Sequence, residues 1–189
     1  LESIRKKLFI YREKRIHPYK DDKILTDWNG LMISAFAKAA QAFDDKIYAE
    51  AAEKSYSFIE KYLTGKDGRL IHRFRDGESG LQAHIDDYAF MINALIDLYE
   101  TTFEIKFLKR AIELNEILMK EFWDEQNGGF YFTSSKSEEL IARQKDVYDG
   151  AVPSGNSVAL LNLIRLSRFT GNIYFEKKAS LLVKYFSGY

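Results

Sequence analysis

The sequence predicts an all-α protein with the architecture of an α/α toroid, in which helical hairpins form an inner and an outer ring. Three stretches, "IYAEAAEK", "KFLKRAIE" and "IYFEKKAS", align on Tyr48, Phe107 and Tyr174 at intervals of 59 and 67 residues. A repeat of this length that contains two helices is typical of stacked or circularly arranged hairpins. Short turns join the two helices within each repeat, and longer segments join one repeat to the next.

The two helices of each predicted pair differ in character. The first helices, "LMISAFAKAAQAF", "AFMINALIDLYETTF" and "SVALLNLIRLSRF", are apolar around most of their circumference, which indicates burial on most sides. The second helices carry one apolar stripe at three- and four-residue steps, as expected for an outer ring. We therefore expect a helix near residues 3–16 and then hairpins over about 28–63, 86–122 and 155–187, all within a single domain spanning residues 1–189.

The long connections between the repeats are predicted to contain small β-hairpins. Residues 64–85 alternate in polarity around Asp76 and Gly77, a pair typical of tight hairpin turns. Residues 123–154 contain "GGFYFTSS" and "ELIARQKDV", which show the same pattern more weakly. Because all inner helices of a toroid run in the same direction, these connections gather at the N-terminal ends of the inner helices. Loops on a rigid scaffold are the usual place for binding and chemistry.

Composition limits the function classes. Lys plus Arg and Asp plus Glu each number 28 among the 189 residues, so neither nucleic acid nor a membrane surface is an expected partner. The absence of cysteine excludes disulfides, thiolate nucleophiles and Cys-ligated metals. No stretch has the length of a membrane span and no signal peptide is visible, so we expect a cytoplasmic protein. Since Leu1 stands where an initiator Met would, we also expect a piece of a longer chain.

Polar residues precede each inner helix at matching places in the repeat. Asp27 lies 21 residues before Tyr48, and Asp86 lies 21 residues before Phe107. In the third repeat the corresponding segment is "YDGAVPSGN", which contains Asp149. The segments "TDWNG", "HIDDYA" and "YDGAVPSGN" should therefore converge on one rim, where helix N-termini present free N–H groups and positive dipole ends. Such a rim suits hydroxyl-rich or anionic ligands.

The stretch "HIDDYAF" supplies the main catalytic candidates. His84 can exchange a proton near neutral pH, and two neighbouring carboxyl groups can split their pKa values and serve as acid and base. Aspartate at a helix start is also a common cap, so plain capping is the alternative for each. We expect Asp86 to cap the second inner helix and Asp87 or His84 to point into the central cavity near Asp149 and Asn156. The catalytic candidates are His84, Asp86, Asp87 and Asp149.

The binding candidates are aromatic, cationic and amide side chains on or near the same rim. Aromatic rings can stack on a sugar or pack in the core, and the polar groups can bind a ligand, cap a helix or face solvent. No two histidines have metal-ligand spacing and no Gly-rich nucleotide motif is present, so we expect no metal and no cofactor. His17 and His72 are weaker candidates. The substrate-binding candidates are Trp28, Asn29, Arg73, Tyr88, Tyr131, Arg143, Ser154 and Asn156.

Four segments together resemble the YyaL-type, thioredoxin-domain-containing family, of which an animal member is known as a spermatogenesis-associated protein. They are "REKRIHPYKDDKILTDWNGLMISAFAKA" (12–39), "DDYAFMINALIDLYE" (86–100), "FWDEQNGGFYFT" (122–133) and "DGAVPSGNSVALLNLIRLS" (149–167). The resemblance implies that the chain is the middle part of an (α/α)6 barrel that follows an N-terminal thioredoxin-like domain. It also implies similarity to N-acylglucosamine 2-epimerases, cellobiose epimerases and six-hairpin glycosidases, although the catalytic histidines of the epimerases have no residue-by-residue match in this sequence.

Two functional hypotheses from different classes follow. The first is a carbohydrate-active enzyme, an epimerase, isomerase or hydrolase, that uses His84 and the aspartates between aromatic walls. The second is a non-catalytic module that binds a sugar or peptide, or serves as a scaffold, for the thioredoxin-like domain. Fold similarity alone does not decide between them. Because a partial toroid exposes apolar flanks such as Leu161 and Ile164, we also expect self-association.

Overall fold

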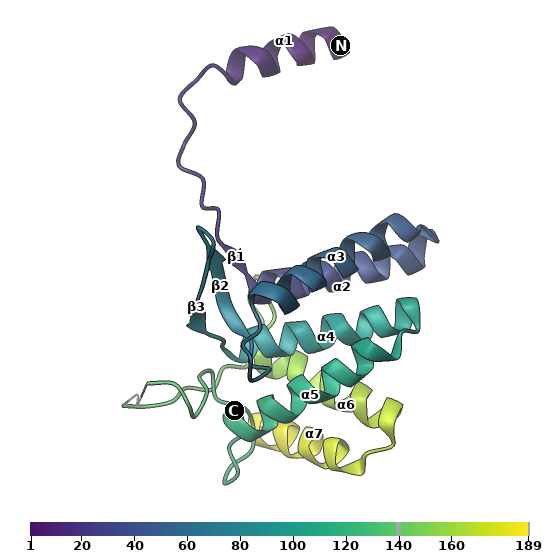
Figure 1. Ribbon diagram of the computed structural model, residues 1–189. Coiled ribbons are helices and arrows are strands. Elements are labelled where there is room, and N and C mark those ends of the chain that lie inside the picture. Colours follow the sequence, from purple (N-terminus) through teal and green to yellow (C-terminus); the bar gives the residue numbers. More distant parts are fainter. Residues whose placement is uncertain (139–140, 189) are drawn as a thin grey trace.

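The predicted toroid is confirmed by the structure, a computed structural model that describes residues 1–138 and 141–188. Figure 1 shows three antiparallel helical hairpins stacked on one another, with α4 packed between α2 and α6 and also against α5. Within the described residues, no helix is both long and apolar enough to cross a lipid bilayer. The hairpins are α2 (Thr26–Phe43) with α3 (Lys46–Tyr62), α4 (Ile85–Thr102) with α5 (Ile105–Phe122), and α6 (Gly155–Thr170) with α7 (Ile173–Phe186).

Each hairpin turns within a few residues because the backbone becomes left-handed directly after the inner helix. Asp44, Phe103 and Gly171 follow α2, α4 and α6 with φ of 52°, 57° and 69°, and each N–H bonds back to the preceding helix. The outer helix then begins at a cap, as where the Asp45 carboxylate accepts the Ile47 N–H at 3.0 Å. These turns lie at the end of the hairpins opposite to the long connections (Figure 1).

The core is centred on α4, as its nearly continuous apolar sequence predicts. Ile92, Leu95 and Leu98 are buried along α4, and Phe107 and Phe122 from α5 are buried against it. The outer helices contribute one buried stripe each and expose the rest, which matches their amphipathic pattern. This rigid core fixes the start of α4 between the starts of α2 and α6.

Gly30 permits the close approach of α2 to α4. A Cβ atom added at Gly30 would lie 2.8 Å from the carbonyl carbon of Phe90 and 3.0 Å from the backbone nitrogen of Met91. We therefore expect Gly30→Ala to lower the free energy of unfolding by about 1–3 kcal/mol, because the two backbones must move apart. Urea denaturation measures the loss. Gly80→Ala is the control, since its Cβ would meet the movable Arg73 guanidinium, and equal losses in both variants would contradict the prediction.

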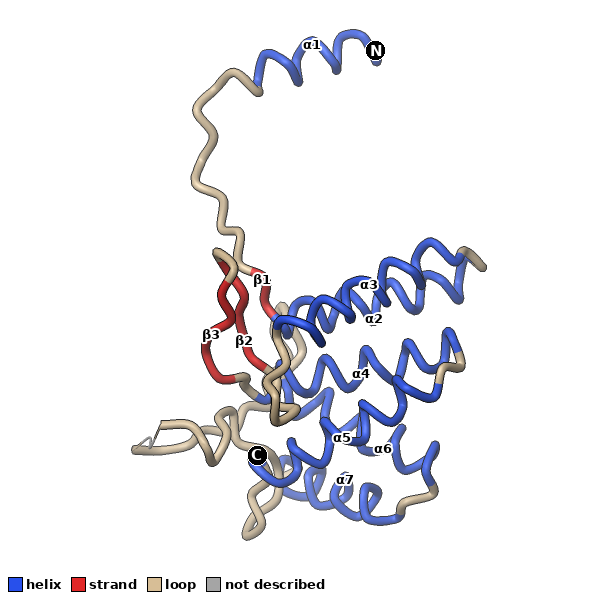
Figure 2. Tube along the Cα trace, viewed as in Figure 1, coloured by secondary structure: helices blue, strands red, loops and turns tan. Residues whose placement is uncertain are grey.

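The first predicted β-hairpin is confirmed and gains a third strand. β2 (Ile71–Arg75) and β3 (Glu78–Gln82) are antiparallel, and β1 (Ile24–Leu25), directly before α2, pairs with the other edge of β2. The turn at Asp76 and Gly77 has φ of 53° and 82°, the left-handed values of a type I′ turn. Figure 2 shows this sheet at the N-terminal ends of the inner helices. The sheet thereby brings residues of β2 to the starts of α2 and α4.

The second predicted hairpin, in residues 123–154, is not confirmed. Its "ELIARQKDV" segment includes residues 139 and 140, which lie outside the described residues. In the described part of this connection there is no strand, only an isolated bridge between Trp123 and Phe130. Instead, the buried Asp124 carboxylate organises the loop, accepting bonds from the Tyr131 hydroxyl at 2.9 Å and the Lys145 ammonium at 2.7 Å. These side-chain bonds replace the expected strand ladder.

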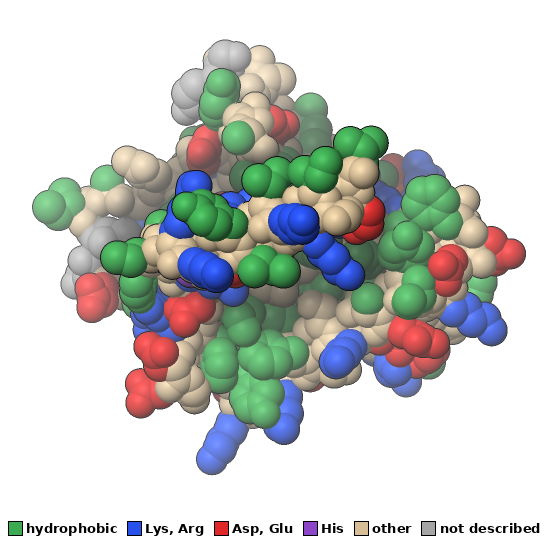
Figure 3. All heavy atoms as spheres, turned by 90° about the horizontal axis from the view of Figure 1, so that it is seen from above, with side chains coloured by type: hydrophobic (Ala, Val, Ile, Leu, Met, Phe, Trp, Pro, Cys, Tyr) green, Lys and Arg blue, Asp and Glu red, His purple; other side chains and the backbone are tan. Residues whose placement is uncertain are grey.

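The N-terminal helix α1 (Glu2–Arg12) is shorter than predicted and contributes no buried residue. Figure 1 shows it projecting away from the hairpins on an extended segment. Figure 3 views the molecule from this side and shows apolar side chains interspersed with Lys and Arg. On the flanks of the stack, Met32 of α2 and both Leu161 and Ile164 of α6 are exposed. The expected exposure of the α6 flank is thus confirmed.

These exposed apolar flanks predict self-association of the chain. Isolated surfaces of this kind are normally covered by another protein surface, so we expect oligomers to form as concentration rises. Sedimentation velocity at protein concentrations from about 5 to 500 μM, roughly the range of dissociation constants of weak oligomers, measures the share of oligomer. Leu161→Lys with Ile164→Lys should shift the distribution toward monomer. A clean monomer of the unaltered chain at the highest concentration would contradict the prediction.

Candidate functional site

Five ionisable side chains meet where α2, α4 and the sheet come together, and we call them the rim cluster. Asp27 comes from the first turn of α2, His72 from β2, and the other three from the start of α4. One ligand-type atom from each of Asp27, His72 and Asp87 lies within 4.8 Å of the others. The ring centres of the two histidines are 5.3 Å apart. The rim cluster consists of Asp27, His72, His84, Asp86 and Asp87.

Asp87, rather than Asp86, closes the start of α4, so the predicted capping role of Asp86 is wrong. The Asp87 carboxylate is fully buried and accepts the backbone N–H of His84 at 2.8 Å and that of Asp27 at 3.0 Å. Nδ1 of His72 lies 3.0 Å from both carboxylate oxygens. The physical reason is that α4 begins at Ile85 with His84 as its N-cap, so Asp87 holds the third helical position, which reaches back to the cap.

Asp86 is left half-buried beside the start of α6. Burial, followed by the charges of Asp87 and Asp27, raises the pKa of Asp86 to about 6, and a bond from the Gly155 N–H opposes this rise. Gly155 allows this close approach, because a Cβ at Gly155 would collide with the Asp86 carboxylate. Asp146, which the sequence did not single out, adds a further negative charge facing Asp86. Asp86 is therefore a carboxyl group that takes up a proton near neutral pH.

The two histidines of the rim cluster have opposite electrostatic environments. The hydrogen bond to Asp87 raises the pKa of His72, with further contributions from the charges of Asp87, Asp27 and Asp86. Burial lowers the pKa of His84. The His84 ring stacks on Phe132 at 4.6 Å, and its Nδ1 atom is buried without a hydrogen-bond partner. His72, the weaker candidate from the sequence, is thus the histidine with a carboxylate partner.

The raised pKa of Asp86 predicts a pH-dependent effect of Asp86→Asn. A carboxyl group that binds its proton more tightly when folded contributes stability that is lost as pH rises from about 4 toward 6. Asparagine has no such loss, so the melting temperature of Asp86→Asn relative to the unaltered chain should increase between pH 4.5 and pH 7.5.

Asp149→Asn is the matched control for this measurement. A bond from the Ser154 N–H lowers the pKa of Asp149, so its titration lies below that pH range. Its relative melting temperature should stay constant. A constant difference for Asp86→Asn as well would contradict the pH prediction.

The third inner helix starts with a confirmed cap and an occupied amide. Ser154 caps α6 by accepting the Ser157 N–H, and the exposed Asp149 accepts the Ser154 N–H at 2.8 Å. Asn156 is buried, and its amide exchanges two bonds with the Phe130 backbone and donates a third to the Asp146 carbonyl at 2.8 Å. The prediction that Asn156 binds substrate through its amide is therefore wrong, because both amide atoms already bind backbone.

Three other binding candidates lie on α2 and β2, which also carry residues of the rim cluster. Trp28 is 62% exposed and follows Asp27 at the start of α2. Asn29 instead donates to the Leu25 carbonyl at 2.7 Å and turns toward α3. Arg73 lies on β2 next to His72, and its Nε atom is buried without a hydrogen-bond partner. Trp28 thus offers the accessible aromatic surface at the rim.

The remaining candidates belong to the packing of the long connections. Tyr88 is buried, and its hydroxyl accepts the Leu70 N–H at 3.2 Å, while burial raises its pKa to about 12. Tyr131 bonds to Asp124, and the Arg143 guanidinium lies 4.1 Å from the centre of its ring. The structure therefore does not bring these three candidates to the rim cluster.

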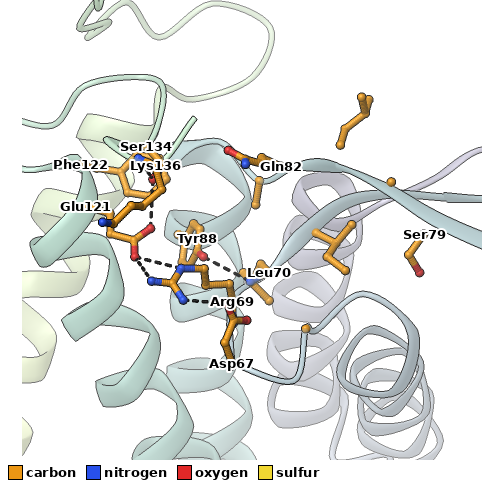
Figure 4. Close-up of a pocket in the computed structure, with 15 residues that line it drawn as sticks. Asp67, Arg69, Leu70, Ser79, Gln82, Tyr88, Glu121, Phe122, Ser134 and Lys136 are labelled. Carbon is orange, nitrogen blue, oxygen red and sulfur yellow. Dashed lines mark hydrogen bonds and ion pairs between the residues drawn. The ribbon is translucent and has the colours of Figure 1, made fainter. Parts of the chain in front are cut away.

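A cavity of about 400 Å³ lies beside Tyr88 and is lined by residues other than the rim cluster. Figure 4 shows its central feature, the Arg69 guanidinium bonded to the Glu121 carboxylate, with Asp67 and Ser134 as further partners. Glu121 is nearly inaccessible and Tyr88 forms part of the wall. Nothing in the sequence linked Arg69 with Glu121, which are 52 residues apart. In this cavity Arg69 and Glu121 bond to each other, whereas in the rim cluster Asp86 is half-buried without an ion-pair partner among the described residues and has a pKa raised to about 6. We therefore take the rim cluster as the better candidate site.

Asp27, His72 and Asp87 are also the group of described residues with metal-ligand spacing. Both Asp87 oxygens already accept hydrogen bonds, and His72 directs Nδ1 at the carboxylate rather than at a shared point. A divalent cation would need His72 to turn away from Asp87. As found, the three residues form a hydrogen-bonded unit, and the expectation of no metal stays a prediction.

Comparisons with known sequences identify relatives that are much longer than this chain. The chain is 35% identical over 197 residues to human spermatogenesis-associated protein 20, covering 99% of this chain and 25% of that protein. It is 36% identical over 188 residues to an uncharacterized protein of Caenorhabditis elegans, covering 95% of this chain and 25% of that protein. No protein-family model matches. The chain thus spans about a quarter of the length of these curated relatives.

Several solved structures with this fold are named as carbohydrate-active enzymes. Cellobiose 2-epimerase from Bacillus thermoamylovorans superposes with a TM-score of 0.73 at 18% identity, over 89% of this chain and 45% of that one. A D-mannose isomerase gives 0.69 at 19% identity, over 88% and 42%. An α-1,6-mannanase of Salegentibacter, inactivated by exchange of two neighbouring aspartates for asparagine, gives 0.69 at 14% identity, over 86% and 46%. The chain is therefore a homologue of about a quarter of spermatogenesis-associated protein 20, and it has the α/α toroid fold of carbohydrate-active epimerases, isomerases and glycosidases.

Proposed function

We propose that the rim cluster binds a sugar and transfers protons on it, so that this domain acts as a sugar isomerase or epimerase. The observation that carries the proposal is the asymmetry of two neighbouring carboxyl groups at the start of α4. Asp87 is buried and held by three donors, whereas Asp86 is half-buried with a pKa raised to about 6. A carboxyl group whose pKa is raised by burial and by neighbouring carboxylates is typical of acid–base catalysis.

The chemistry of sugar isomerisation suits such a site. Moving a carbonyl group along a sugar requires a base that removes a proton from carbon and an acid that supplies one to oxygen. Asp86 changes its protonation near neutral pH, and the exposed Trp28 ring next to Asp27 offers a surface for an apolar sugar face. Loss of activity in the mannanase when two neighbouring aspartates are exchanged supports a catalytic role for such a pair on this fold.

A thermal-shift screen of the chain against mono- and disaccharides, including D-mannose and cellobiose, tests the proposal. A sugar should raise the melting temperature of the unaltered chain, and Asp86→Asn or Trp28→Ala should reduce that rise. Asp76→Asn, at the exposed tip of the β2–β3 turn, is the control that keeps the full shift. Each sugar is tested at about 50 mM, well above a dissociation constant of roughly 1 mM. No shift with any sugar at this concentration would contradict sugar binding.

A non-catalytic scaffold for a thioredoxin-like domain is the second candidate function. It is favoured by the occupied state of Asp87 and Asn156, which bond to the backbone as structural residues do. The scaffold function requires a thioredoxin-like partner domain, and we propose a cytoplasmic location for the chain with either function. Copurification of the chain with the thioredoxin-like domain of a full-length relative tests it. Complex formation without any sugar effect would favour the scaffold, and no complex would exclude it.

A further inference from the structure

His72 and Asp87 form an Asp–His pair whose geometry resembles that of catalytic pairs. Nδ1 of His72 lies 3.0 Å from both Asp87 oxygens. Since a carboxylate only accepts hydrogen bonds, Nδ1 must carry the hydrogen, which leaves Nε2 as the exchangeable position of the ring. The His72 side chain is 19% exposed, whereas Asp87 is inaccessible. In the described part of the chain, no hydrogen bond to Nε2 is formed, so this atom is free to meet a ligand.

Asp87 is held too firmly to act on a substrate directly. Its oxygens accept two backbone N–H groups, from Asp27 and His84, in addition to His72. Each of these donors comes from a different element, namely α2, the residue before α4, and β2. A carboxylate fixed in this way orients its partner and stabilises the partner's positive charge. The group it orients is His72.

We propose that His72, oriented by Asp87, is a catalytic residue of the rim cluster and that its Nε2 atom exchanges a proton with the oxygen of the bound sugar. This inference rests on the proposed function and assigns the second proton-transfer group beside Asp86. It replaces the role that the sequence gave to His84, whose ring is stacked on Phe132.

The step balances for the conversion of an aldose to a ketose. The Asp86 carboxylate takes the proton from carbon 2, the C–H electron pair becomes the double bond of an enediol, and Nε2–H of His72 protonates the oxygen on carbon 1. Asp86 then returns its proton to carbon 1, while the hydroxyl on carbon 2 gives its proton to Nε2 and becomes the ketone. Both side chains end in their initial forms, and no oxidant, reductant or cofactor is needed.

The pKa shifts of the two groups run in the direction that this step requires. Asp86 acts as a base above its pKa of about 6, which is raised by burial and by the charges of Asp87, Asp27 and Asp146. His72 acts as an acid below its own raised pKa. The charged groups that raise this pKa are Asp87, Asp27 and Asp86, and the His84 ring lies beside the His72 ring. The reaction rate should therefore follow a bell-shaped curve between these two pKa values.

Deuterium exchange at the imidazole C2–H of the three histidines tests the pair without any substrate. Mass spectrometry over pH 4–10 gives a titration midpoint for each of His17, His72 and His84. We expect the His72 midpoint above the ordinary value of about 6.5 and a fall in Asp87→Asn. A His72 midpoint at or below the ordinary value, or one unchanged in Asp87→Asn, would overturn the pair.

Kinetics with D-mannose as the probe test the catalytic role. His72→Gln should lower kcat by about 10²-fold or more, with KM changed by less than about threefold, and should remove the alkaline limb of the pH profile. His17→Gln, on the exposed N-terminal segment, should retain full activity. An active His72→Gln would overturn the catalytic role. If the unaltered chain turns over no sugar, the proposed function and the catalytic role of His72 both fail. A raised His72 midpoint would in that case establish only a structural ion pair between His72 and Asp87.

Discussion

Replacing Asp86 by asparagine is expected to slow sugar isomerisation by about 10²- to 10⁴-fold, the usual effect of removing a positioned acid–base group. Asparagine keeps the size and the acceptor oxygen that faces the Gly155 N–H, but it cannot take a proton from carbon. The melting temperature at pH 7.5 should not fall, because the half-buried charge of Asp86 is removed with it. Measured kcat and KM for D-mannose, with a melting curve for each protein, test both statements.

Asp76→Asn is the matched control for this variant, since it makes the same chemical change at an exposed turn. Its kcat and KM should stay within about twofold of those of the unaltered chain, because a surface substitution usually has only a small effect. An Asp86→Asn protein that retains kcat would show that the rim carboxyl group does not transfer the proton. An Asp86→Asn protein that loses kcat and stability together would instead indicate a structural role.

Replacing Asp97 by alanine is expected to cause the largest loss of stability, about 3 kcal/mol or more. Asp97 is fully buried on α4, where it accepts from the Arg165 guanidinium of α6 at 2.6 Å and from the Ser34 hydroxyl of α2. Lys38 of α2 adds a further ion pair at 3.6 Å. This carboxylate therefore connects all three inner helices, and its removal leaves the largely buried Arg165 without its main partner.

Glu100→Ala separates the buried pair from ordinary surface electrostatics. Glu100 also pairs with Arg165, at 2.8 Å, but is itself exposed, so its removal should cost less than about 1 kcal/mol. Urea denaturation at pH 7 gives both free energies of unfolding. Equal losses for Asp97→Ala and Glu100→Ala would contradict the claim that Asp97 connects the inner helices.

The arrangement of hairpins was predictable because local periodicity determines it. Phe107 of the second repeat and Phe175 of the third are buried at the start of their outer helices, while the aligned Tyr48 is half-buried and Tyr174 is exposed. Gly171 takes the left-handed backbone that a turn after an inner helix needs. The turn at Asp76 and Gly77 was equally recognisable from its own chemistry. These features depend on neighbours in sequence, so a single chain suffices to identify them.

The details of the site were not predictable because they depend on exact boundaries and distant partners. Placing the N-cap at Asp86 rather than at His84 exchanged the roles of Asp86 and Asp87, although both assignments fit the same helix. His72 reaches Asp87 only because the sheet carries it across to the start of α4. Asp97 likewise finds Arg165, 68 residues away, through the packing of α4 against α6. No spacing in the sequence encodes these contacts.

The most direct test of the rim cluster compares Asp86→Asn with Asp87→Asn at pH 7.5, measuring the melting temperature and the affinity for D-mannose in both. If Asp86 exchanges the proton and Asp87 is the fixed structural partner of His72, Asp86→Asn keeps its melting temperature and loses the response to the sugar. Asp87→Asn then melts several degrees lower, since a buried group with three donors is disturbed. Equal melting temperatures and unchanged sugar responses in both variants would contradict this division of roles.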